Sequence, residues 1–155
     1  MKHVALSLVL SLFMVMPALV VTSGCAGKQF TPAQTAKVGT TLIESVRKVQ
    51  QFTTENVRSG AIPRNIGDRI TDTNTKIKAS GEAVLSALDV WNAAASGDLR
   101  NAEALKVFAL ISKLELEVAE LTGAALPTFE LSRNLSQLTS NILVDIEKIK
   151  AALRS

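Results

Sequence analysis

Cysteine and histidine, the side chains best suited to nucleophilic and acid–base chemistry near neutral pH, each occur once in this 155-residue chain, as Cys25 and His3. Both belong to an N-terminal stretch that has the layout of a targeting signal. If residues 1–24 are removed, no imidazole remains and Cys25 becomes the first residue. Such a chain has no Cys/His metal site, no histidine general base and no Ser-His-Asp triad. It also forms no disulfide within itself.

The densest group of carboxylates is Glu115, Glu117 and Glu120. A cation bound by oxygen alone needs several carboxylates that converge. On a helix Glu115 and Glu117 point about 200° apart, which favours a solvated face over a metal site. We therefore expect no metal.

The remaining catalytic side chains have poor spacing. Ser112 and Lys113 are adjacent rather than facing, and no Ser-x-x-Lys motif occurs. The glycines stand singly, so no glycine-rich phosphate loop is indicated. Trp91, the only Trp, lies on an apolar stripe, which favours a core role over ligand stacking. The sequence predicts no catalytic residue, no cofactor and a protein that is not an enzyme.

The N-terminal stretch reads as a secretory signal. A positive start that includes Lys2 precedes a nearly unbroken apolar run from Val4 to Met16, and Pro17 and small residues follow. Two alternatives stay open: an ordinary secreted protein, and an uncleaved anchor, because Val4 to Val21 is 18 residues, near the length that spans a bilayer.

The run Thr22-Ser23-Gly24-Cys25-Ala26 resembles the lipobox of bacterial lipoproteins, and the resemblance covers about the first 26 residues only. Thr22 stands where the family more often has Leu. The resemblance implies cleavage between Gly24 and Cys25 and acylation of Cys25, with the lipid bilayer as its partner through the acyl chains, since one chain alone binds weakly. It also implies a place in the cell envelope. In a Gram-negative source, Ala26 implies the periplasmic face of the outer membrane.

Residues 25–30 form only a short tether before helix signals begin at Thr31. Five or six extended residues reach at most about 20 Å. We therefore expect the folded domain to lie close against its membrane.

The charge balance gives no sign of a nucleic-acid partner. The chain has 17 basic and 14 acidic residues, a formal net charge of +3, and the two signs alternate along the sequence. A nucleic-acid footprint needs basic residues clustered on one face.

The mature part, residues 31–155, shows four amphipathic segments over about 32–58, 63–95, 99–122 and 128–153. Thr31, Pro32 and Gln34 form a strong helix start, Asp98 is the expected cap of the third segment, and glycines end the first three. Long helices joined by short loops predict an all-α fold, an antiparallel up-down-up-down four-helix bundle.

The third segment is expected to be the most buried, because it has a broad apolar face that begins at Leu105 and that Leu99 and Leu116 widen. Gly81 in the second segment predicts a bend or a close backbone approach. Five polar residues occupy positions near the core. They serve as hydrogen-bonding or small packing groups between helices, or they mark a loosely packed or exposed seam that accepts a partner helix: Thr35, Thr53, Thr73, Ser80 and Thr139.

Three functions remain. The first is a membrane-anchored envelope lipoprotein, a non-enzymatic structural or protein-interaction module with a protein partner at the membrane surface. The second is a carrier that holds an apolar ligand, a lipid or a quinone, within the bundle. The third is a weak enzyme that uses only Ser, Lys or carboxylates.

Overall fold

The computed structural model describes residues 31–94 and 97–154, which form an all-α four-helix bundle. The helices are α1 (Pro32–Arg58), α2 (Arg64–Ala93), α3 (Asp98–Thr122) and α4 (Phe129–Arg154). The predicted fold class is confirmed, and each predicted segment matches its helix to within two residues at either end.

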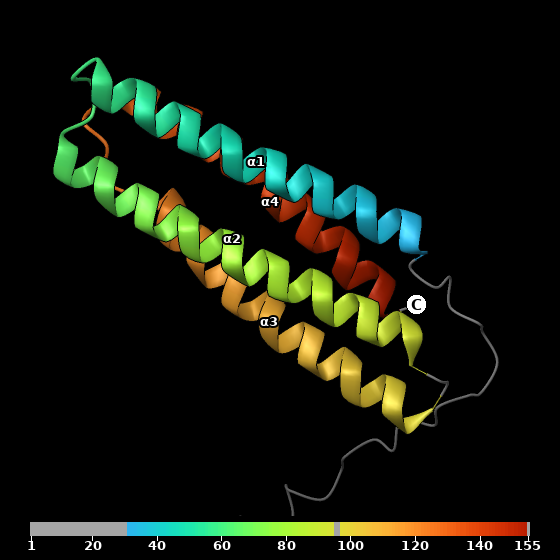
Figure 1. Ribbon diagram of the computed structural model, residues 1–155. Helices are drawn as coiled ribbons and strands as arrows, with labels where there is room; N and C mark the ends of the chain where they lie inside the picture. The colour runs from blue at the N-terminus through green and yellow to red at the C-terminus, as the bar shows by residue number, and fades with distance from the viewer. Residues whose placement is uncertain (1–30, 95–96, 155) are drawn as a thin grey trace, which may run out of the picture.

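Each helix packs against two neighbours: α1 and α3 both contact α2 and α4. In Figure 1 each helix runs back alongside the one before it, so α1 begins at the end of the bundle where α4 finishes. The connections from α1 to α2 and from α3 to α4 lie together at the opposite end.

Local side-chain chemistry defines the helix ends. The Thr31 hydroxyl accepts a hydrogen bond from the Gln34 backbone N–H (3.2 Å), and the Gln34 side chain accepts one from the Thr31 N–H (2.8 Å), which completes the predicted capping box. Gly60 and Gly97 adopt positive φ angles of 79° and 100° at the turns that follow α1 and α2. The expected cap at Asp98 is wrong: Gly97 is the N-cap and Asp98 lies in the first turn, where a carboxylate favours the helix dipole.

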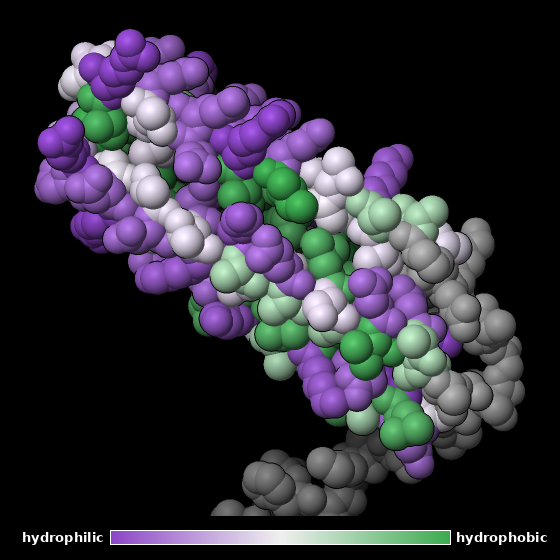
Figure 2. All heavy atoms as spheres, in the orientation of Figure 1, coloured by the Kyte–Doolittle hydropathy of each residue, from purple (hydrophilic) through white to green (hydrophobic). Residues whose placement is uncertain are grey.

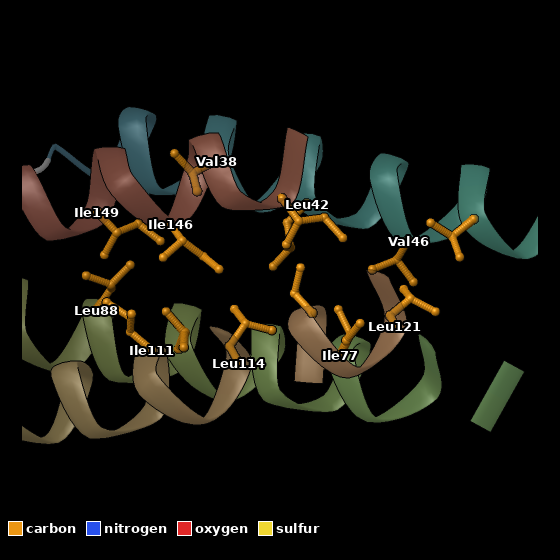
Figure 3. Packing of buried hydrophobic residues seen from close by; sticks show 14 of the residues in the cluster. Val38, Leu42, Val46, Ile77, Leu88, Ile111, Leu114, Leu121, Ile146 and Ile149 are labelled. Carbon is orange, nitrogen blue, oxygen red and sulfur yellow. The ribbon is translucent and has the colours of Figure 1, made fainter. Parts of the chain in front are cut away.

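The face of the bundle formed by α1 and α2 is largely hydrophilic, with hydrophobic side chains gathered along the groove between the two helices (Figure 2). Beneath it, all four helices send aliphatic side chains into one core (Figure 3). Val49, Ile77, Ile111 and Ile142, one from each helix, are fully buried. The spacing of three and four residues between core positions therefore produces one continuous core.

Glycine brings α1 and α2 close together. A Cβ atom at Gly81 would lie 2.4 Å from Cδ2 of Leu42, and one at Gly67 would lie 2.2 Å from Cγ2 of Val57. Only a residue without a side chain fits at this distance. The close approach predicted near Gly81 is confirmed.

The expectation that the third segment is the most buried is wrong. Helix α2 contributes ten buried residues and α3 only five. Leu99, Leu105 and Leu116 are 69%, 70% and 72% exposed. Leu105 and Leu116 lie about 120–140° around the helix from the buried Ile111, because successive residues turn by about 100°. These leucines therefore lie on the side of α3 that faces away from the core, and they make that side apolar.

Candidate functional site

The predicted processing site, Gly24 and Cys25, lies outside the described residues, as do the signal segment 1–24 and the tether 25–30. Lipidation at Cys25 therefore stays a prediction. None of the helices in the described ranges is long and apolar enough to cross a membrane.

The acidic group on α3 does not converge. Glu115 pairs with Lys150 of α4, Glu117 lies 3.9 Å from Lys113, and the Glu120 carboxylate accepts a hydrogen bond from Thr73 of α2 (3.4 Å). The three carboxylates thus have three separate partners on different sides of α3, as their spacing predicts. Within residues 31–94 and 97–154, His, Cys, Asp and Glu form no group of three suited to a metal ion.

The other candidate side chains have structural partners. The Ser112 hydroxyl donates to the Phe108 carbonyl (3.1 Å) within its own helix, and Lys113 faces Glu117. Trp91 is buried, which confirms the predicted core position, and the Arg100 guanidinium lies 4.4 Å from the centre of its ring. This cation–π contact joins the end of α2 to the start of α3.

The five polar residues near the core are all buried, so the interpretation that they mark an exposed seam is wrong. Three of them connect helices: Thr139 and Thr122 share a hydrogen bond (3.1 Å), Thr73 donates to Glu120, and Thr35 accepts from Asn92 (3.2 Å). The Thr53 hydroxyl donates to the Val49 carbonyl of its own helix (2.8 Å). The hydroxyl groups of the four threonines in this set therefore have hydrogen-bond partners inside the bundle.

Three buried polar residues were missed by the sequence interpretation, Ser45, Asn74 and Asp145, and the last two bond to another helix. Asn74 donates from its amide to the Val46 carbonyl of α1 (3.0 Å). Asp145 of α4 accepts from the Thr41 hydroxyl of α1 (2.5 Å) and from Lys148 (2.7 Å). Both residues connect α1 to a neighbour, so their role is to fix how the helices pair.

Lys150 is the centre of a charged cluster between α3 and α4. Its ammonium group contacts Glu115 on α3 and Glu147 (3.1 Å) on α4. The hydrogen bond to Glu115 comes first among the causes that raise the pKa of Lys150 above 10.5, followed by the one to Glu147. The lysine therefore stays charged and joins the two helices.

A hollow of about 360 Å³ lies beside the start of α2 and the connection between α3 and α4. Its lining mixes charged and apolar side chains, Arg69 and Glu120 with Ile66 and Ile70. Arg69 and Glu120 are exposed, so this hollow meets solvent. The bundle axis itself is occupied by the fully buried core side chains (Figure 3).

The surface feature that stands out is on α3. Leu105 and Leu116 lie on the side of the helix that faces away from the core, and the residues between and beyond them on that side are small and exposed. We name this set the outer line of α3: Ala102, Leu105, Ala109, Ser112, Leu116 and Ala119. It is an apolar helix face that the bundle does not use.

Compared with known proteins, the chain matches no family model, no curated protein and no solved structure.

Proposed function

We propose that this protein is an envelope lipoprotein: a helical bundle held on a membrane by acyl chains at Cys25, with a non-enzymatic structural or protein-interaction role. The attachment is supported by the apolar run and the lipobox-like Thr22-Ser23-Gly24-Cys25. The thiol is the nucleophile that accepts the lipid, and several acyl chains together hold a protein on a bilayer.

The interaction role is supported by the bundle itself. The side chains that could do chemistry are engaged with one another: Glu115 with Lys150, Glu120 with Thr73, and Ser112 with its own helix. The observation that carries this part of the proposal is the exposure of Leu105 and Leu116, at 70% and 72%. Exposed apolar faces on a soluble domain favour contact with another surface.

The core supports this function over that of a carrier. A lipid or quinone needs an apolar chamber of several hundred Å³. Here Ile77, Ile111 and Ile142 belong to one core cluster and are fully buried. Native mass spectrometry of the purified protein separates the two functions: a clean protein mass across preparations agrees with the interaction module, and a constant extra mass of a lipid or quinone contradicts it.

The attachment is tested by the substitution Cys25→Ala in cells fed a labelled fatty acid. The wild-type protein is expected to carry the label and Cys25→Ala to lose it, because the acylated thiol is gone. Thr22→Leu is the matched control: it restores the aliphatic residue that the lipobox family favours and is expected to keep full labelling. A Cys25→Ala protein that labels like wild type would contradict the proposal.

A further inference from the structure

The outer line of α3 has the spacing of a helix–helix seam. Its six residues follow one another at intervals of three, four, three, four and three, from Ala102 to Ala119. This is the seven-residue repeat whose apolar positions face a partner helix in coiled coils. All six residues are exposed.

The seam is open for docking. The buried residues of α3, such as Val107 and Val118, face α2 and α4, the only two of the described helices that α3 contacts. The outer line lies on the opposite side of the helix, so no part of the bundle obstructs it. Two apolar lines on one helix therefore point in opposite directions, and only one of them has a partner within the bundle.

The polar groups along the outer line are already satisfied. The Ser112 hydroxyl donates to the Phe108 carbonyl (3.1 Å) and needs no other partner. Along one edge, Lys106 pairs with Glu103 (2.5 Å) and Lys113 faces Glu117 (3.9 Å). A partner that covers the outer line therefore leaves no hydroxyl without a hydrogen bond, and it meets no unpaired charge at this edge.

The order of side chains along the line fits a copy of itself. Read in either direction, small and large residues alternate in the same order: small, large, two small, large, small. When two copies of α3 lie face to face, leucine meets leucine and small residues meet small ones, whichever way the second helix runs. A two-fold dimer needs a self-complementary patch of this kind. We propose that the outer line of α3 binds the outer line of a second copy of this chain.

The contact is small. One helix face buries a few hundred Å² on each copy, below the roughly 800 Å² per partner of a stable complex. In dilute solution the pairing is weak, and confinement of two copies to one membrane strengthens it by raising their effective concentration. The strength of pairing in the cell thus depends on the proposed lipid anchor, whereas the choice of the outer line as the pairing surface does not.

The test uses the full chain in its own membranes, with a photo-cross-linking amino acid in place of Lys113 beside the contact, because its reaction does not depend on lysine amines. A cross-linked species of twice the mass is expected. Leu116→Lys places like charges at the seam and is expected to reduce that species at least tenfold. The matched control is Val144→Lys on α4, an exposed valine outside the outer line, which is expected to leave it unchanged.

Charge rescue excludes a simple folding defect. A Leu116→Lys copy is co-expressed under a second tag with a Leu116→Glu copy, or with a Leu105→Glu copy. The first mixture restores pairing if the two helices are parallel, and the second restores it if they are antiparallel. Either rescue supports a two-copy seam. The proposal is overturned if neither mixture restores the species, or if Val144→Lys abolishes it as completely as Leu116→Lys does.

Other occupants give other outcomes. If the outer line binds a different protein, the wild-type chain cross-links to that protein and not to its copy. If it lies on the lipid surface, Leu116→Lys leaves the level of the two-copy species unchanged. Each result overturns the proposal. The lipid anchor is judged separately, by fatty-acid labelling at Cys25, so its failure is distinguishable from a failure of pairing.

Discussion

Helices α2 and α3 lie side by side, yet they use their side chains in opposite ways. Helix α2 buries ten residues, among them the polar Thr73, Asn74 and Ser80. Helix α3 buries five, all aliphatic, and leaves Leu99, Leu105 and Leu116 exposed to solvent. Each of these helices has two neighbours, so burial here follows how closely the neighbours approach, and not the hydropathy of the helix itself.

Small residues explain the burial of α2. Gly67 and Gly81 let α1 approach its backbone closely, so α2 is covered by α1 on one side and by α3 on the other. Polar side chains at this tight contact are tolerated because they bond across it, as Asn74 does to Val46. Helix α3 has no such glycine contact with α4, and one of its apolar faces stays exposed to solvent.

The two faces of α3 can be separated by a matched pair of substitutions. Ile111→Ala, in the core, is expected to lower the free energy of unfolding by about 2–5 kcal/mol, because it removes buried methyl groups and leaves a cavity. Leu116→Ala, on the outer line, is expected to change it by less than about 0.5 kcal/mol. Denaturant unfolding of both variants measures the difference, and equal losses would contradict the assignment of the two faces.

The close contact of α2 with α1 is tested at Gly81. Gly81→Val is expected to lower the free energy of unfolding by about 1–3 kcal/mol, because its side chain must displace the buried Leu42. The control is Gly39→Val, where a Cβ would lie 3.1 Å from the end of the partly exposed Leu85 side chain, which can move. A Gly81 variant no less stable than the Gly39 variant would show that the glycine contact does not hold α1 against α2.

The charged cluster between α3 and α4 is expected to have a smaller effect than the buried sites at Ile111 and Gly81. Lys150→Met should cost about 0.5–1 kcal/mol near neutral pH, since the ammonium group is only partly shielded from solvent. The pKa of Lys150 is raised above 10.5 in the fold, so this contribution is complete below that pH and is lost as the pH rises through the raised value.

The difference in stability between wild type and Lys150→Met should therefore be seen at about pH 8 and shrink at about pH 11. Thermal unfolding of both proteins at the two pH values measures it. A difference of the same size at both pH values would show that Lys150 acts through packing and not through charge.

The sequence predicts the helices of this protein well because their signals are local. Thr31 and Gln34 cap α1 through contacts three residues apart, and the core spacing marks each helix face. The buried Asp145 has no such signal, because its partner Thr41 lies 104 residues away. The sequence also could not predict which face of α3 is buried. The buried line and the outer line both have intervals of three and four residues, and only the packing of α3 against α2 and α4 selects between them.

The central claim is that this bundle is attached to a membrane through Cys25, and the mass of the protein extracted from cell membranes tests it most directly. The account predicts a chain that begins at Cys25, with residues 1–24 removed and the mass of the acyl groups added to that residue. A chain that still begins at Met1, or one that begins at Cys25 without acyl groups, would contradict it.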